Sequence, residues 1–384
     1  MIYLISFRQM RILILNWRDI KNPSSGGAEI LTHEIAKYLA QKGNDVVLFS
    51  SRFERSKSNE ILDGVKIIRK GHTIVRYLTR SVHFLAFQEY KKYFKGNIDL
   101  IIDEVHGFPF FTPLYAKEKK IALVCEVAGN LWFKLFGPFL GLAGWLVEKL
   151  YLRIIYRNTQ FITISESAKE SLIRNGVNKK NIKVIPIGFS FPKQTIKASK
   201  EKEPTLIFLG RVAKSKGVED AILVLEKLKH FSKIKLWVVG KGDSDYVESL
   251  KKLIKDFGLK DKVTLYGSVS DYKKFELLSR AWILIHPSKT EGWGINVIEA
   301  NAVGTPAVGY NVPGLKDSIQ NNKTGLLTDK NSIDSLVNKT ALLLNDKEMY
   351  GRFSREVIVW SKRFEWQNAG EKTWSIIKEL YGKK

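Results

Sequence analysis

Short apolar runs alternate with amphipathic stretches along almost the whole chain. The runs cover residues 11–17, 45–51, 64–70, 99–103, 121–127 and 160–165 in the first half, and 205–210, 234–240, 262–267, 282–288 and 305–310 in the second. Such runs are typical of strands that are buried on both faces of a parallel sheet. The stretches between them have a helical period, so the pattern predicts an α/β protein with helices covering parallel sheets.

A polar segment separates the two sets of predicted strands. Residues 187–204 are charged and bounded by prolines, which predicts a linker between domains. The chain of 384 residues is long enough for two domains. We expect two Rossmann-like domains, over 1–190 and 191–361, facing each other across a cleft that receives the loops after their strands. A C-terminal helix from about 362 to 384 is expected to pack back on the first domain.

The net charge of +24 is unusually basic and is unevenly distributed. Residues 1–200 contain 32 Lys and Arg against 16 Asp and Glu. This excess suits a phosphorylated substrate, an anionic membrane face or nucleic acid, although a lysine-rich source proteome would also explain it. The single cysteine, Cys125, excludes a disulfide framework and favours a reducing, cytoplasmic compartment.

The beginning of the chain is apolar but does not resemble a targeting signal. Residues 1–17 contain Arg8 and Arg11 and lack a small-residue cleavage site, so no secretory signal is expected. Met10 is an alternative start, because the first predicted strand begins directly after it. No run of 18 apolar residues occurs, so no membrane-spanning segment is expected.

Two glycine-containing turns predict phosphate sites. Gly26 and Gly27 follow the first predicted strand and open a helix, whose positive end would present N–H groups to an anion. In the second half, Arg211 and Lys216 lie in the strand-to-helix loop of FLGRVAKSKG, where their charges suit a diphosphate. An ordinary strand-to-helix turn and a solvated charged loop remain the alternatives. Neither turn has the G-x-G-x-x-G pattern, which disfavours a nicotinamide-dependent dehydrogenase.

The segment EGWGINVIEA, residues 291–300, places two glutamates on either side of a glycine-containing loop and a predicted helix start. If the helix begins near Ile295, Glu299 lies about 6 Å along its axis from that first residue, whereas Glu291 lies in the loop before it. Carboxylates accept directed hydrogen bonds from vicinal hydroxyls, so a ligand with sugar hydroxyls at both ends and phosphates between them fits this layout. The alternative is one acid near a helix N-terminus and one surface acid.

Together, these three motifs resemble those of the family 4 retaining glycosyltransferases, which have the two-domain GT-B fold. The segment E-G-W-G-I-N-V-I-E-A matches the E-x7-E motif of that family, G-R-V-A-K-S-K-G its donor-phosphate loop, and G-G-A-E its N-terminal glycine loop. The likeness extends from residue 11 to about 375. It implies transfer of a hexose from a UDP- or GDP-linked donor to a glycan or lipid-linked acceptor, with no metal or other cofactor.

The resemblance also implies roles for individual residues. Glu299 would bind the donor ribose, Glu291 the donor sugar, and Arg211 and Lys216 the departing diphosphate. The donor-binding residues implied are Gly26, Gly27, Arg211, Lys216, Val269, Gly292, Trp293, Gly294, Ile295 and Glu299, with Ser268 beside Val269 near the nucleotide base. The catalytic candidates are His106, Glu104 and Glu291; at the acceptor side the choice between Asp103, Glu104 and His106 stays open, since all three follow one predicted strand.

Two segments combine aromatic and basic residues in a way that suits the headgroup region of a membrane. They are residues 130–160, in which only 135–147 are free of charge, and residues 75–95. Core-packed helices with solvated basic sides are the alternative. With the basic first half, they predict a cytoplasmic enzyme that attaches peripherally to an anionic membrane face and takes a lipid-linked acceptor.

Three other activities compete with this hypothesis. A sugar phosphorylase or a nucleotide-sugar hydrolase would share the fold and differ only in the group that replaces the acceptor. A nucleic-acid-binding protein would explain the charge. No helix-turn-helix, zinc or RNA-recognition signature supports that last class, so no nucleic acid partner is expected. We therefore expect a glycosyltransferase of glycan, glycolipid or surface polysaccharide biosynthesis.

Overall fold

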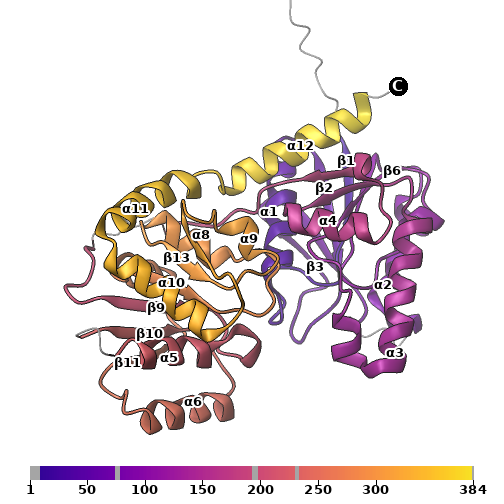
Figure 1. The fold of residues 1–384 in the computed structure, drawn as a ribbon. Coiled ribbons are helices and arrows are strands. Elements are labelled where there is room, and N and C mark those ends of the chain that lie inside the picture. The colour runs from indigo at the N-terminus through magenta and orange to yellow at the C-terminus, as the bar shows by residue number, and fades with distance from the viewer. Residues whose placement is uncertain (1–8, 74–77, 193–197, 230–232, 383–384) are drawn as a thin grey trace, which may run out of the picture. The chain divides into compact units, whose positions relative to one another are not determined.

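The computed structural model of the protein describes residues 9–73, 78–192, 198–229 and 233–382. The chain divides into two compact units, of which the first comprises Met1–Ile187 and Trp366–Lys384, and the second Gly188–Glu365. The units therefore divide after Ile187 and before Trp366, where the sequence predicted a boundary after residue 190 and a C-terminal helix from about 362. Figure 1 shows that helices pack against a sheet in each unit.

The first unit contains an eight-stranded sheet. Its strands are β1 (Arg11–Leu15), β2 (Asp45–Ser50), β3 (Asn59–Leu62), β4 (Val65–Arg69), β5 (Leu100–Glu104), β6 (Lys119–Leu123), β7 (Gln160–Thr163) and β8 (Ile182–Val184). Their order in the sheet is β3-β4-β2-β1-β5-β6-β7-β8. Each of the six predicted runs coincides with a strand, whereas β3 and β8 were not predicted. The runs work as predictors because β1, β2 and β5 are buried almost throughout.

The expectation of purely parallel pairing is wrong at the edge of this sheet, where β3 pairs with β4 in antiparallel fashion. Asp63 and Gly64 connect the two strands with φ angles of 51° and 81°. An Asp-Gly pair with two positive φ angles is the favoured two-residue hairpin turn. The turn chemistry, which the periodicity does not detect, therefore sets the direction of β3.

The α-helices among the described residues of the first unit are α1 (Gly27–Gln41), α2 (Val82–Glu89), α3 (Leu131–Leu150), α4 (Glu166–Arg174) and α12 (Trp366–Gly382). Short helical turns extend α2 and α3, namely η2 (Tyr90–Phe94) and η4 (Tyr151–Ile155). The helix α1 begins directly after Gly26, as predicted. The helix α12 packs against α1 so closely that a Cβ atom at Gly370 would lie 2.2 Å from the Tyr38 ring.

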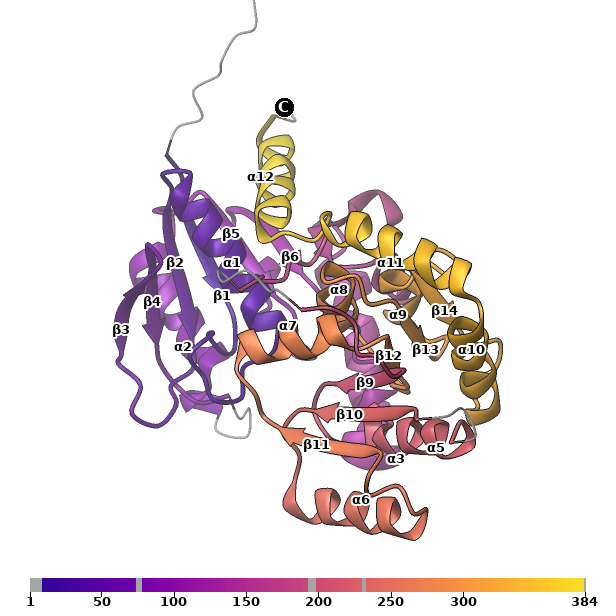
Figure 2. The same cartoon turned by 90° about the vertical axis from the view of Figure 1, so that its left-hand side faces the viewer.

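The second unit contains a six-stranded sheet whose neighbouring strands are all parallel. Its strands are β9 (Thr205–Leu209), β10 (Lys235–Val239), β11 (Val263–Gly267), β12 (Ile283–His286), β13 (Ala307–Gly309) and β14 (Gly325–Leu327), in the order β11-β10-β9-β12-β13-β14. Its helices are α5 (Val218–Lys227), α6 (Ser244–Asp256), α7 (Asp271–Arg280), α8 (Ile295–Ala302), α9 (Leu315–Ser318), α10 (Ile333–Asn345) and α11 (Lys347–Ser361). The five predicted runs coincide with strands, and β14 was missed (Figure 2).

Each sheet has a position where the strand order reverses. In the first unit the chain moves outward from β1 to β2 and then crosses to β5 on the other side of β1. In the second unit β9 lies between β10 and β12 in the same way. Ligands of open parallel sheets bind outside the carboxyl ends of the strands at such a position. The fold therefore predicts sites after β1 and β5 in the first unit, and after β9 and β12 in the second.

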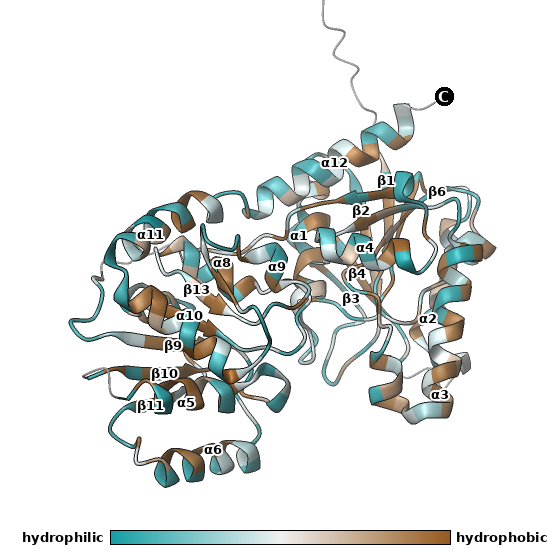
Figure 3. Ribbon diagram, in the orientation of Figure 1, coloured by the Kyte–Doolittle hydropathy of each residue, from teal (hydrophilic) through white to brown (hydrophobic). Residues whose placement is uncertain are grey.

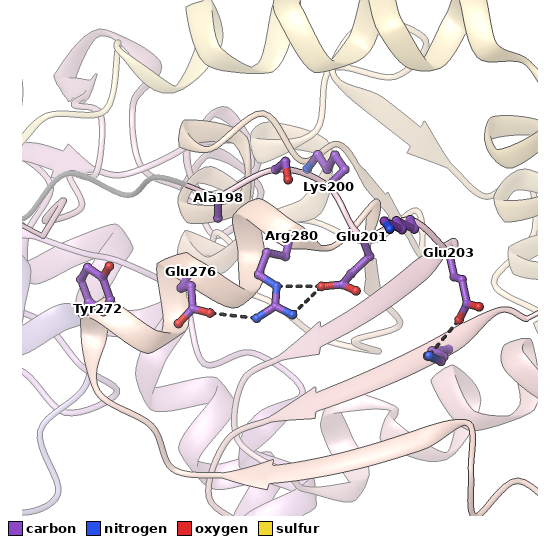
Figure 4. A pocket seen from close by; sticks show the side chains of 10 residues that line it. Ala198, Lys200, Glu201, Glu203, Tyr272, Glu276 and Arg280 are labelled. Carbon is purple, nitrogen blue, oxygen red and sulfur yellow. Dashed lines mark hydrogen bonds and ion pairs between the residues drawn. The ribbon is translucent and has the colours of Figure 1, made fainter.

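The predicted linker is only partly a linker. Residues 193–197 lie outside the described residues, but the next stretch is attached to the second unit. Lys200 Nζ donates to Ala281 O at 2.6 Å and to Thr305 Oγ1 at 2.5 Å. Arg280 lies between Glu201 and Glu276 along an open groove of about 800 Å³ (Figure 4). The ion pair between Arg280 on α7 and Glu201 therefore attaches this segment to the helix.

Membrane attachment through residues 75–95 is not supported by the structure. Val75 and Arg76 lie outside the described residues, and α2 with η2 inserts Val82, Ala86 and Tyr90 into a buried core cluster. The sequence predicted that no segment is long and apolar enough to cross a membrane, and that prediction is wrong as far as length and composition are concerned. Among the described residues, one helix, Leu131–Ile155, meets both criteria. Its conformation is considered below.

Candidate active site

The loop after β12 presents the first glutamate of the E-x7-E segment. The strand ends at His286, and α8 begins at Ile295, the predicted position, after Gly294 with a φ of 87°. Glu291 lies in this loop, and its Oε2 is 2.7 Å from the Nζ of Lys216, which comes from the loop after β9. The two sequence motifs that were expected to bind sugar and diphosphate therefore meet at the position where the strand order of the second sheet reverses.

The pKa of Glu291 depends on burial and on two neighbouring side chains, His286 and Lys216. Burial raises the pKa of Glu291, but His286 and Lys216 outweigh that effect and leave the pKa below its usual value. His286 Nε2 lies 3.7 Å from Glu291 Oε2. Because burial lowers the pKa of His286, its ring is neutral at neutral pH, and Lys216 is then the cation beside the carboxylate.

Asn296 fixes the orientation of His286 in the first turn of α8. Its amide Nδ2 donates to the carbonyl of Leu209 at the end of β9, so its Oδ1 accepts the Nε2–H of His286 at 2.9 Å. One side chain thus joins the ends of β9 and β12 to the start of α8. It fixes the tautomer of the His286 imidazole, which lies beside Glu291.

The second glutamate, Glu299, also has a lysine partner. Its Oε1 lies 2.7 Å from Nζ of Lys274 on α7, and Lys274 also contacts Asp271 at 3.0 Å. Burial raises the pKa of Glu299, while the adjacent Lys274 lowers it and so opposes the protonation of the carboxyl. Both side chains are largely shielded from solvent. The pair therefore holds a carboxylate in a place where an isolated one would tend to protonate.

Close backbone contacts at glycines hold the loops of this site together. A Cβ atom at Gly217 would lie 2.2 Å from Pro287 O, and one at Gly314 would lie 2.3 Å from Glu291 O. The loop after β9 thus touches the loop after β12, which in turn touches the segment before α9. Glycine permits these approaches because it has no side chain.

Replacing Gly217 with Ala is expected to destabilise the protein by about 1–3 kcal/mol and to remove any stabilisation by a bound nucleotide. The new methyl group would push the loop that contains Lys216 away from the loop that contains Glu291. Gly258→Ala is the matched control, because Gly258 has a similar φ of 66° but no atom within 4 Å of a Cβ. Melting curves with and without nucleotide measure both effects. Equal behaviour of the two variants would contradict the proposed loop contact.

The remaining donor-side candidates of the second unit surround this centre in different ways. Arg211 is exposed in the loop after β9, and Val269 packs partly against the core between β11 and α7, beside exposed Ser268. The Trp293 ring is buried against Phe364 with 5.3 Å between ring centroids. Contacts between residues 292–295 and a donor molecule would therefore be made mainly by the backbone, while the buried Trp293 ring anchors the loop to the core.

In the first unit, Gly26 and Gly27 form the predicted turn at the start of α1. The backbone N–H of Gly26 donates to Glu29 Oε2 at 2.7 Å, so a side chain of the helix already occupies one of the terminal donors. Glu29 is buried, and the GGAE sequence is in effect a capping arrangement. It stabilises the turn and places a carboxylate at the position where the strand order of this sheet reverses.

The three acceptor-side candidates after β5 have different environments. Asp103 is fully buried and accepts hydrogen bonds from Tyr156 Oη at 2.5 Å, Thr112 Oγ1 at 2.7 Å and two backbone N–H groups. A carboxylate with this many internal donors is a structural residue. The hydrogen-bonding capacity of Asp103 is therefore largely used inside the first unit.

Glu104 differs from Asp103 in having an unused oxygen. It is 2% exposed, and its Oε2 has no hydrogen-bond partner among the described residues. Burial raises the pKa of Glu104 well above its usual value, and the carboxylates of Glu29 and Asp103 raise it further. Its surroundings therefore favour the protonated form of the carboxyl more than those of an exposed glutamate would.

His106 lies two residues further on and is exposed. Its ring stacks on Trp17 at 4.9 Å between centroids, and the guanidinium of Arg18 covers the same indole at 4.0 Å. Partial desolvation lowers the pKa of His106, so the ring is neutral at neutral pH. The end of β5 thus presents a carboxyl group with a raised pKa and an imidazole with a lowered pKa.

Sequence reasoning missed several residues of these two sites, namely Trp17, Glu29, Lys274, His286 and Asn296. Asn296 and His286 had a detectable signal, because both are polar residues at the predicted junction of a buried strand and a helix. Lys274 had none. It lies on α7, 25 residues before Glu299 in the sequence, and only the tertiary structure brings the two charges together.

Comparison with known proteins agrees with this geometry. The model for Glycosyltransferase Family 4 matches residues 25–190, and the model for Glycosyl transferases group 1 matches residues 191–360. An uncharacterised glycosyltransferase of Methanocaldococcus jannaschii is 24% identical over 381 residues, which cover 93% of this chain and 96% of that protein. A GDP-mannose-dependent phosphatidylinositol monomannoside mannosyltransferase of Mycobacterium tuberculosis is 31% identical over 176 residues, 44% of each chain.

Among solved structures, Anabaena HepE in complex with UDP-glucose superposes with a TM-score of 0.72 at 16% identity, covering 97% of this chain and all of that one. The two α/β units, with their largely parallel sheets, have the GT-B fold. The chain belongs to glycosyltransferase family 4, as both family models show.

Proposed function

We propose that the protein is a retaining hexosyltransferase that uses a nucleotide-diphosphate sugar as donor and a glycan or a lipid-linked molecule as acceptor. The observation that supports this proposal best is the meeting of Lys216 with Glu291, and of Lys274 with Glu299, at the carboxyl edge of the second sheet. A cation suited to a diphosphate, Lys216, and two carboxylates suited to sugar hydroxyls therefore belong to the loops after β9 and β12 and to the helix α8.

The proposed roles follow from the chemistry of each group. Glu299 accepts hydrogen bonds from the ribose hydroxyls, and Glu291 together with the backbone of residues 292–295 positions the transferred sugar. As the bond between the sugar C1 and the diphosphate oxygen breaks, Lys216 and Arg211 stabilise the negative charge on the leaving group. A new bond forms between C1 and the acceptor oxygen, and the proton of the acceptor hydroxyl passes to an oxygen of the departing diphosphate. These cations take the place of a metal in the proposal.

In the first unit, Gly26 and Gly27 are proposed to approach the donor phosphates through their backbone. Glu104 and His106 are proposed to act on the acceptor side. The unused Oε2 of Glu104 and the exposed ring of His106 support this assignment. Because burial raises the pKa of Glu104 and lowers that of His106, the uncharged forms of both groups are favoured, and in these forms each can donate or accept a hydrogen bond with a hydroxyl.

The donor is proposed to be a UDP- or GDP-hexose. HepE was solved with UDP-glucose, and the mycobacterial relative is named as GDP-mannose-dependent. That relative acts on a phosphatidylinositol mannoside, which supports a lipid-linked acceptor here. We further propose a cytoplasmic enzyme attached to the membrane face; the single cysteine and the basic first half of the chain are consistent with that location.

Thermal stabilisation by nucleotides tests the donor site. A ligand that binds only the folded state must raise the melting temperature by mass action. UDP, GDP and their hexose conjugates are compared on the wild type, Glu299→Ala and Arg211→Ala, with and without EDTA. We expect one base series to stabilise the wild type in EDTA and to lose its effect in both variants. Stabilisation that requires a divalent metal would overturn the metal-free mechanism, and none from any nucleotide would overturn the donor site.

A further inference from the structure

The helix α3 has a sharp break near its start. Gly137 has a φ of 73° and a ψ of −175°, and Pro138 follows it. These two residues divide α3 into a short arm, 131–136, and a long arm, 138–150, which are visible as separate pieces in Figure 1. A straight helix of this length and composition could cross a membrane, but the break at Gly137 and Pro138 divides this helix into two shorter pieces.

The short arm folds back along the long arm. A Cβ atom at Gly141 would lie 2.6 Å from the Cα of Phe133, and one at Gly144 would lie 2.5 Å from the Trp132 ring. In a continuous helix, residues 133 and 141 would be about 12 Å apart. The two arms therefore form an antiparallel helical hairpin with its apex at Gly137, and the two glycines allow the arms to touch.

A buried glutamate fastens the base of this hairpin to the first unit. Glu148 accepts hydrogen bonds from the Trp132 indole N–H at 3.0 Å and from the backbone N–H groups of Ala128 and Gly129 at 2.9 and 2.7 Å. The next turn, η4, buries Tyr151 and Leu152. The hairpin thus projects from a rigid base with a defined direction.

The projecting part of the hairpin exposes only apolar side chains. Its exposed residues between positions 135 and 147 are Leu135, Phe136, Pro138, Phe139, Leu140, Leu142, Ala143, Leu146 and Val147. Phe139, next to the apex, is 89% exposed. The hydrophobic colour of these residues is visible along α3 in Figure 3. A continuous apolar surface of this kind is typical of a site that another apolar phase covers.

Basic side chains flank this apolar surface. Lys134 lies on the short arm, while Lys149, Arg153 and Arg157 follow the long arm toward the base. The ammonium of Lys149 lies 3.7 Å from the centroid of the Trp145 ring, and such amphipathic pairs suit the depth of lipid headgroups. The flanking charges match an anionic lipid surface. Two copies of the chain would instead bring like charges together around a shared apolar contact.

We propose that the α3 hairpin inserts its apex into the acyl region of one leaflet of an anionic membrane and does not cross it. The long arm rises about 20 Å, less than the ~30 Å hydrocarbon core of a bilayer. Insertion of the apex by about 5–10 Å leaves the basic residues among the headgroups. This inference rests on the proposed membrane location and adds the means of attachment, which is hydrophobic insertion in addition to charge attraction.

Vesicle binding tests the insertion. Phe139→Glu is expected to weaken binding to phosphatidylcholine vesicles containing phosphatidylglycerol about 10- to 100-fold, the loss expected when a large apolar side chain no longer leaves water. Ile61→Glu is the matched control, since Ile61 is 72% exposed on β3 of the same unit. Wild-type binding is expected to persist in part at high salt. Equal loss in both variants, or complete loss of wild-type binding at high salt, would overturn hydrophobic insertion.

A fluorescent label at the apex gives a second readout that does not depend on affinity. Because Cys125 is the single cysteine, a Cys125→Ala chain with Phe139→Cys can be labelled at one position. Vesicles should shift the emission of a polarity-sensitive label there to the blue, and nitroxide lipids should quench it, while a label at Ile61→Cys should not respond. A label at 139 that stays in water would overturn the proposal, as would a dimer that only Phe139→Glu dissociates.

Nucleotide-induced melting shifts on the same variants separate this inference from the proposed function. Phe139→Glu is expected to keep the shift, because the hairpin is remote in sequence from both glutamates of the donor site. If Phe139→Glu no longer binds vesicles but keeps the nucleotide-induced shift in melting temperature, both proposals stand. If the wild type binds vesicles through Phe139 but responds to no nucleotide, the hairpin inserts and the proposed donor chemistry is wrong.

Discussion

Lys216→Ala is expected to lower kcat/KM for the nucleotide-sugar donor about 100- to 1,000-fold. The lysine supplies positive charge where the diphosphate leaves, and this charge matters most in the transition state. Most of the loss should therefore appear in kcat. Removal of Lys216 also takes away the cation beside Glu291, since the nearby His286 is neutral at neutral pH. Release of the nucleoside diphosphate over a range of donor concentrations measures kcat and KM separately.

Lys214→Ala is the control for this result. Lys214 lies in the same short helical turn, η6 (Lys214–Lys216), but its side chain is exposed. A change of less than about twofold is expected, because an exposed charge is screened by water and salt. If both variants lost activity to the same extent, the general charge of the loop would be responsible and not the placement of Lys216.

Lys274→Met is expected to weaken donor binding about 10- to 100-fold in mildly acidic solution and to make the affinity depend on pH. Burial raises the pKa of Glu299 and Lys274 opposes that shift, so without the lysine the carboxyl protonates more readily. A protonated carboxyl has less capacity to accept hydrogen bonds from the ribose. Affinity should therefore recover as the pH rises and the carboxyl ionises. Titration calorimetry with the nucleoside diphosphate at several pH values measures this dependence.

Lys273→Met is the neighbouring control, since Lys273 pairs with Glu276 on the same helix. It should bind the nucleotide with the affinity and pH profile of the wild type. An opposite outcome for Lys274→Met is also informative: if affinity rose at every pH, Lys274 would compete with the ribose for Glu299 and would not hold the carboxylate ready for it.

Most of the fold could be predicted because its strands are buried on both faces. Runs such as 11–17 and 205–210 have few polar positions, and burial in the middle of a parallel sheet is the reason. The strands that were missed, β3, β8 and β14, are short or lie at an edge. Only 3 residues form β14. Such strands contain too few positions for a period to appear.

The candidate site was only partly predictable, for a physical reason. Glu291 and Glu299 belong to one local segment, so their spacing indicated two separate carboxylates. Their partners Lys216 and Lys274 come from other loops, and the pairing depends on the order of strands in the sheet. Asp103 shows a second limit. Its position at a strand end suggested a site, but the sequence did not indicate that Thr112, nine residues further on, and Tyr156, much later in the chain, donate hydrogen bonds to its carboxylate.

The hairpin shows a third limit of sequence analysis. The aromatic and basic residues of 130–160 indicated a membrane-facing segment, but not its geometry. The conformation depends on Gly137 with Pro138, and on the contact of Trp132 with Gly144. In sequence, a glycine-proline pair within an apolar stretch predicts a break, but it does not predict that the two arms touch.

Release of nucleoside diphosphate from UDP- and GDP-hexoses tests the central claim most directly. The wild type, Lys216→Ala and Lys214→Ala are each incubated with a panel of these donors, with and without vesicles that contain extracted membrane lipids as acceptors. The account predicts release from the donors of one base, dependent on the lipid acceptor and lost in Lys216→Ala but not in Lys214→Ala. Release that is absent with every donor, or that Lys216→Ala leaves unchanged, would contradict it.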